Sequence, residues 1–127
     1  NHAFLRPADL AKLSALNKPI IWTFHDSNAF TGGCHVRYSC ENFHRQCGNC
    51  PLLKFDGKND ISHKNWLSNQ KAYSELNFHI VAPSNWMAKS VKESSLLGLR
   101  NTSVIPNTIE IDVFKIKKFF PIQKNYR

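Results

Sequence analysis

Three short, mainly apolar runs stand out along the chain: Ile20–Phe24, Phe78–Ala82 and Ser103–Ile105. Short runs of this kind are typical of strands that are buried in a parallel sheet. The first run ends abruptly at His25, and each of the other two is followed by a proline. The pattern therefore predicts three parallel strands whose carboxyl ends are sharply defined.

Helical signals fill the stretches between these runs. Leucines three residues apart predict a helix over residues 6–16. A second helix should begin at an N-cap formed by Asp60 or Ser62, and a third should begin at Ser84 and stop near Gly98. The alternation of helices and strands indicates an α/β fold. We expect a partial Rossmann-like parallel sheet of about three strands with flanking helices and a long Cys-rich loop.

Composition limits the class of protein. The 127 residues are 42% hydrophobic and 12% aromatic, which fits one ordinary globular domain at most. No apolar run reaches 18 residues, and the start resembles no signal peptide, so we expect a cytoplasmic location. The chain begins mid-pattern and without Met, and three strands are few for such a sheet. We therefore interpret it as an excerpt whose missing strands precede Asn1.

The net charge of +8 suits an anionic partner or a solvated basic face. No helix is predominantly basic on one side, so nucleic acid is not expected as a partner. The last stretch, from Glu110 to Pro121, alternates charged and bulky apolar residues. It is expected to be a linker or to touch an anionic membrane surface through its basic and aromatic side chains, which are Lys115, Lys117, Lys118, Phe119 and Phe120.

All four cysteines fall within one stretch, with the spacing C-x5-C-x6-C-x2-C over Cys34, Cys40, Cys47 and Cys50. Their number and closeness suit a structural, tetrahedral Zn²⁺ site, in which a histidine such as His35 or His44 could replace one cysteine. Two disulfides, or four reduced thiols buried as small apolar groups, are the alternatives.

His25 and Asp26 follow the first predicted strand directly, which is where open parallel sheets bind ligands. We predict a catalytic role for both. In this role Asp26 would orient the imidazole of His25 or bind a hydroxyl of the ligand. Further substrate contacts are predicted at Gly32, Gly33, Ser84 and Asn107. The three tryptophans fall on strand and helix patterns, and we expect all of them in the core: Trp22, Trp66 and Trp86.

Three segments carry a family resemblance. FHDSNAFTGGCH followed by spaced cysteines and CGNCPLL, then IVAPSNWMAKSV, then VIPNTIEIDVF, occur in this order along nearly the whole chain. Together they resemble one branch of glycosyltransferase family 4, whose members are built from two Rossmann-like domains in the B-type arrangement. The chain departs from that pattern at Ser27-Asn28, where the family more usually has an apolar or aromatic residue, and at Thr108, where the family has glycine.

The resemblance implies a domain division and an activity. Residues 1–109 would be part of the N-terminal, acceptor-side domain, with a Cys-rich loop over 25–53, and residues 110–127 would start the linker to the second domain. Such enzymes move a sugar from a nucleotide-sugar donor to a hydroxyl of a polysaccharide or lipid-linked acceptor, and they generally retain anomeric configuration without a catalytic metal. The donor-binding glutamates lie in the second domain, so the excerpt alone should be inactive.

The sequence also allows a different class of function. The basic charge and the cysteine spacing alone would suit a small zinc-binding interaction module. The two interpretations differ in the sheet that they require. The enzyme domain needs buried parallel strands, whereas the module needs only a folded cysteine loop.

Overall fold

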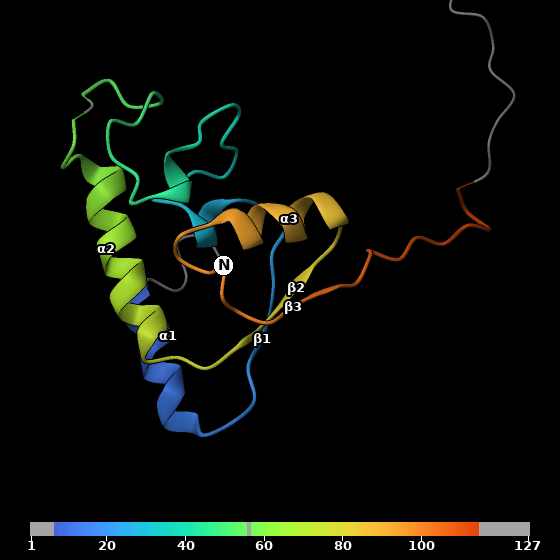
Figure 1. Ribbon diagram of the computed structural model, residues 1–127. Coiled ribbons are helices and arrows are strands. Elements are labelled where there is room, and N and C mark those ends of the chain that lie inside the picture. Colours follow the sequence, from blue (N-terminus) through green and yellow to red (C-terminus); the bar gives the residue numbers. More distant parts are fainter. Residues whose placement is uncertain (1–6, 56, 115–127) are drawn as a thin grey trace, which may run out of the picture.

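The computed structural model describes residues 7–55 and 57–114 (Figure 1). The elements follow one another as helix α1 (Pro7–Ala11), 3-10 helix η1 (Lys12–Leu16), strand β1 (Ile21–Thr23), 3-10 helices η2 (Asn28–Phe30) and η3 (Asn42–His44), helix α2 (Ile61–Ser74), strand β2 (His79–Ala82), helix α3 (Asn85–Glu93) and strand β3 (Thr102–Val104).

The three strands form one parallel sheet in the order β1-β2-β3. Ile21 lies opposite His79, and Ile80 lies opposite Thr102. β1 and β2 are shorter than their apolar runs, and β3 is shifted by one residue toward the N-terminus relative to its run. Only β2 is largely buried, so the prediction of buried strands is wrong for β1 and β3, which have no fully buried residue. The sheet and its helices confirm the predicted α/β class and are consistent with a partial Rossmann-like fold.

The core lies between the sheet and the helices. Helix α1 packs on α2, and α3 packs on β2 and β3. Aromatic rings fill much of the space, with Trp22 in edge contact with both Phe24 and Tyr73. The residues that are least exposed come from every layer: Phe30, Leu76, Ile80, Val91 and Leu97.

Two helices begin where the sequence predicts them. The Asp60 carboxylate accepts the backbone N–H groups of Ser62 and His63, which makes it the N-cap of α2. Burial would raise the pKa of Asp60, but these hydrogen bonds, with one from the Ser62 hydroxyl and one from the Cys50 amide, outweigh it and lower the pKa to about 2. Ser84 Oγ accepts the N–H of Met87 and caps α3.

Three predictions about the helices need correction. The first helix keeps α geometry only to Ala11 and continues as a 3-10 helix, which ends at Asn17 in a left-handed conformation. Helix α3 ends at Glu93, before Gly98: the next residue, Ser94, is extended, and its hydroxyl donates to the Phe30 carbonyl at 2.7 Å. Trp86 is 59% exposed and not in the core, since the first turn of α3 directs it away from the sheet.

Among the described residues, no helix is long and apolar enough to cross a membrane. After β3 the chain runs away from the body of the molecule (Figure 1). Its apolar side chains in this stretch are exposed, including Ile109, Ile111 and Phe114. The basic and aromatic residues 115–120, for which a membrane contact is predicted, lie outside the described residues.

Candidate functional site

The carboxyl end of β1 brings the two predicted catalytic residues to the edge of the sheet. Phe24 is only 2% exposed and donates its backbone N–H to the Val81 carbonyl at 2.9 Å. The next residue, His25, is exposed, and Asp26 is half-buried. Both therefore lie at the edge where open parallel sheets bind ligands. Their catalytic role stays a prediction.

His25 and Asp26 line two surface hollows. One hollow, of about 250 Å³, lies along residues 22–29. The other, of about 290 Å³, lies between α3 and residues 35–38. A larger open hollow, of about 600 Å³, has no histidine or carboxylate in its lining. Of these three hollows, only the first two are lined by both a histidine and a carboxylate.

Asp26 organises the turn that follows β1. One carboxylate oxygen accepts the N–H of Asn28 at 2.8 Å, and the other lies 3.2 Å from Nδ1 of His35. The backbone N–H of Ser27 donates to the His35 carbonyl at 3.0 Å. These bonds bring two segments of the loop together, so that His35 stands beside Asp26 on the rim of the second hollow.

The second hollow has an aromatic wall. Tyr38 is 72% exposed and Trp86 is 59% exposed, and both line it. The Arg37 guanidinium lies 4.6 Å from the centre of the Phe43 ring and 5.6 Å from that of Trp86, within the range of cation–π attraction. It also donates to Ser90 Oγ at 3.3 Å. Arg37 therefore joins the loop to α3 and holds this wall together.

One face of α2 fixes the backbone that follows His25. Side chains four residues apart share a helix face. The three side chains on this face donate to successive loop carbonyls, namely Asn65 to Gly32 (3.2 Å), Asn69 to Thr31 (3.3 Å) and Tyr73 to Ala29 (3.0 Å). The remaining carbonyl, of Phe30, accepts from Ser94 Oγ at 2.7 Å. Buried carbonyls need such partners, so α2 and α3 together dictate the path of the loop.

The predicted substrate contacts at the glycines have structural partners. Gly32 donates its N–H to Cys47 Sγ at 3.2 Å, and Gly33 donates its N–H to Thr31 Oγ1 at 3.1 Å. Both amides thus hydrogen-bond within the loop. A substrate contact by either glycine stays a prediction.

Ser84 and Asn107 follow the carboxyl ends of β2 and β3, at the same edge of the sheet as His25. Ser84 Oγ is occupied as the cap of α3, and Asn107 is exposed. Neither side chain is among those that line the two hollows beside His25.

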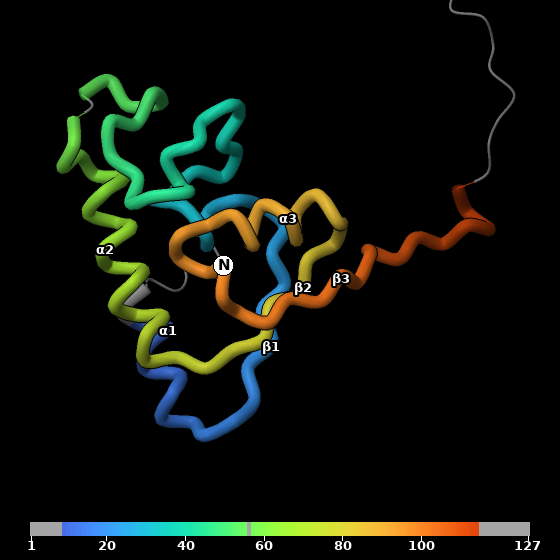
Figure 2. The backbone as a smooth tube through the Cα atoms, viewed as in Figure 1, coloured from blue at the N-terminus to red at the C-terminus, as the bar shows by residue number. Residues whose placement is uncertain are grey.

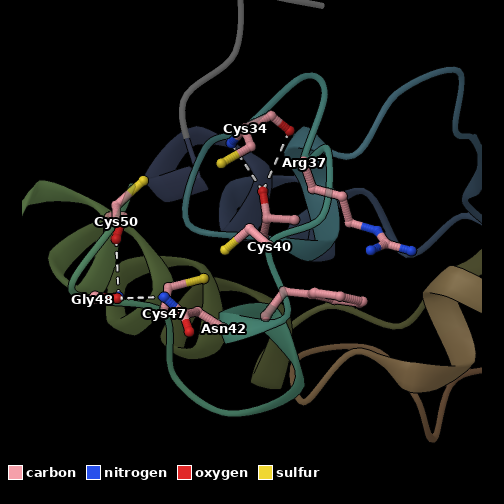
Figure 3. Close-up of a pocket in the computed structure, with 10 residues that line it drawn as sticks. Cys34, Arg37, Cys40, Asn42, Cys47, Gly48 and Cys50 are labelled. Carbon is pink, nitrogen blue, oxygen red and sulfur yellow. Dashed lines mark hydrogen bonds between the residues drawn. The ribbon is translucent and has the colours of Figure 1, made fainter. Parts of the chain in front are cut away.

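The four cysteines line a single small cavity together with Thr31, Arg37, Asn42, Phe43, Gly48 and Ser62. Figure 3 shows the four sulfurs turned toward a common space. All four are free thiols, and Cys50 is only 6% exposed. The loop between β1 and α2, which is drawn in cyan to green in Figure 2, thus folds around this cavity.

The closeness of the thiols affects their titration. Burial, together with the neighbouring Cys50, Cys47 and Cys40 thiolates, raises the pKa of the Cys34 thiol to about 11. Burial also raises the pKa of Cys47, although the Gly32 amide works against it. Like charges this close disfavour one another, so the neighbouring thiols oppose the ionisation of Cys34 and Cys47.

Among the described residues, no group of three or more histidine, cysteine, aspartate or glutamate side chains has the arrangement of a metal site as it stands. The two histidines considered as alternative ligands face carboxylates instead, His35 at 3.2 Å from Asp26 and His44 at 3.9 Å from Glu93. The structure gathers the four predicted thiol ligands in one cavity, and metal binding stays a prediction.

Comparison with protein-family models, with curated proteins and with solved structures finds no match to this chain.

Sequence reasoning missed three features of this site. Trp86 was assigned to the core from its helical position, although it directly follows the cap and first residue of α3, where a side chain is commonly exposed. Tyr38 has a left-handed backbone with φ of 49°, which no feature of its sequence indicates. The sequence also gives no sign that His35 lies beside Asp26, which is nine residues away.

Proposed function

We propose that the chain is part of the N-terminal, acceptor-side domain of a family 4 glycosyltransferase. The enzyme would move a sugar from a nucleotide-sugar donor to a hydroxyl of a polysaccharide or lipid-linked acceptor. The observation that carries the proposal is the position of His25 and Asp26 at the carboxyl end of β1, where both residues line the same two hollows. The sequence resemblance supplies the reaction.

Each part of the site has a role in this proposal. The exposed imidazole of His25 exchanges a proton with, or hydrogen-bonds, the acceptor hydroxyl. Asp26 holds the turn and His35 in place. Tyr38 and Trp86 offer flat apolar faces with a polar group at one end, which suits a sugar ring with one apolar face and a rim of hydroxyls.

The location follows from the acceptor. A lipid-linked acceptor would place the enzyme in the cytoplasm, peripherally at the inner face of the cell membrane. The surplus of basic residues, with a net charge of +8, favours such an anionic surface.

The alternative function, a small basic zinc-binding interaction module, draws less support. Such a module needs only the folded cysteine loop. Here the loop is one part of a larger structure, because α2 binds its backbone and the core also draws buried side chains from α2, β2 and α3.

The proposal is tested by measuring sugar transfer by the protein that the full reading frame around this chain encodes. The protein is incubated with a panel of nucleotide sugars and glycan or lipid-linked acceptors, and transfer is measured. His25→Ala should lower kcat by about 10²-fold or more if the imidazole transfers a proton. His79→Ala is the matched control, because His79 lies at the amino end of β2, away from both hollows.

Two results would contradict the proposal. One is the absence of transfer with every donor and acceptor by a folded wild-type protein. The other is normal turnover of His25→Ala together with a melting temperature several degrees lower, which would identify His25 as a structural residue. If His25→Ala only raises the KM for the acceptor and leaves kcat unchanged, the site stays as proposed, but His25 then only hydrogen-bonds the bound acceptor and does not transfer a proton.

A further inference from the structure

The cysteine cavity is separate from the hollows beside His25. None of the four cysteines lines either of those hollows. The cavity is lined by the loop between β1 and α2 and by the first turn of α2, through Ser62. Its volume is about 10 Å³, which is room for one water-sized occupant.

The backbone around Cys47 is strained in a way that local sequence does not require. Cys47, Gly48 and Asn49 all have positive φ, at 51°, 93° and 46°. Non-glycine residues adopt this conformation only where the surroundings impose it. The turn brings Cys50 to the same cavity as Cys47, and the amide of Gly32 points at Cys47 Sγ at 3.2 Å. An N–H group aimed at a sulfur stabilises that sulfur when it is a thiolate.

The rest of the loop is built to hold these turns. The Asn42 amide donates to the Gly48 carbonyl at 2.9 Å, and the Gly48 N–H donates to Ser62 Oγ at 2.9 Å. The N–H of Cys50 donates to the Asp60 carboxylate at 2.8 Å. The pair Cys47 and Cys50 is therefore tied directly to the start of α2.

We propose that Cys34, Cys40, Cys47 and Cys50 together bind one Zn²⁺ ion as a closed structural site. Zinc prefers thiolate ligands in a tetrahedron at about 2.3 Å, and four cysteines are the full ligand set of many structural sites. The ion supplies the positive charge that lets four neighbouring thiols ionise together. The four sulfurs already share one cavity.

The site is structural and not catalytic. Four sulfurs fill the coordination of a tetrahedral ion and leave no open position for water or substrate. The ion instead ties residues 34–50 together. This segment includes Arg37 and Tyr38, which form part of the wall beside His25, so the ion stabilises the wall without touching the substrate.

Metal content tests the proposal on this chain, independently of any sugar transfer. Protein purified without chelator should contain about one zinc per chain by elemental analysis. Replacement of zinc by Co²⁺ should produce the absorption of tetrahedral cobalt–thiolate coordination. Cys47→Ser combined with Cys50→Ser should abolish both signals. His35→Ala and His44→Ala are the controls and should retain about one metal ion per chain.

Three results would overturn the proposal. The first is wild-type protein that is folded by circular dichroism yet binds neither Zn²⁺ nor Co²⁺. The second is two Cys–Cys bonds found by mass spectrometry of the non-reduced protein. The third is loss of metal in a histidine variant, which would replace the four-sulfur site by a mixed one. The cobalt spectrum of the wild-type protein decides the matter even where the double cysteine variant fails to fold.

Discussion

Gly32 marks the closest approach between the loop and helix α2. A Cβ atom on this residue would lie 2.2 Å from the carbonyl oxygen of Ser62, which is a backbone atom and cannot rotate away. The Asn65 side chain also bonds the Gly32 carbonyl. The absence of a side chain at this position therefore allows the loop to lie against the first turn of the helix.

Gly32→Ala should destabilise the fold by about 1–3 kcal/mol, the usual cost of forcing extra volume into a packed contact. Urea unfolding measures the effect. Gly57→Ala is the matched control, because a Cβ there meets nothing within 4 Å. Equal stability of the two variants would show that the loop moves away from α2 without cost.

Single residues also show what sequence could predict. The caps of α2 and α3 were predicted because capping is a local effect: Asp60 and Ser84 each bond an amide two or three residues further along. The exposure of Trp86 was not predicted, because the first turn of α3 presents it to a hollow that it shares with residues 35–38, which are distant in sequence. The role of Gly32 depends in the same way on Ser62.

At the scale of elements, α2 does two things at once. Trp66 and Ala72 are buried in the core, while Asn69 and Tyr73 donate to loop carbonyls. A helix with one apolar and one polar face is easily recognised from sequence. Here the buried positions are partly polar, because the surface that α2 covers is backbone as well as side chains. The sequence therefore predicted the helix but not the polar contacts that it makes.

Asn69→Ala should lower the free energy of unfolding by about 1–3 kcal/mol, because the buried Thr31 carbonyl loses its donor. Gln70→Ala, on the exposed side of the same helix, should change stability little. Thermal melts of both variants at one pH provide the comparison. A Gln70 variant as unstable as the Asn69 variant would mean that helix propensity, and not the loop contact, is responsible.

The strands also differ in what could be predicted locally and what depends on distant residues. Their number, order of appearance and approximate positions were predictable from apolar runs. Their parallel register was not, because the pairing of Ile21 with His79 depends on how the intervening loop and helix fold.

At the scale of the whole molecule, the sheet has two open edges within the described residues, since β1 and β3 each pair only with β2. Ile21 on β1 is 70% exposed. An unpaired edge with exposed apolar side chains is a template for association with another chain.

The chain expressed alone should therefore self-associate with rising concentration, as measured by sedimentation velocity. Ile21→Lys should reduce this association, because a charge at an edge opposes strand pairing. Leu67→Lys makes the same change at an exposed position of α2, away from the edges, and should have little effect. A monodisperse wild-type monomer at all concentrations would refute the expectation.

The parallel pairing of β1 with β2 also has a kinetic consequence. Ile21 meets His79 only after the cysteine loop and α2 have been closed into one large loop of chain. Closure of a longer loop costs more entropy, and non-local pairing slows folding. Helix α2 depends on local contacts and can form early, whereas the sheet forms late. A cross-link between Cys34 and Cys50 shortens the free chain between the strands, so an ion bound there would speed the step at which the sheet assembles.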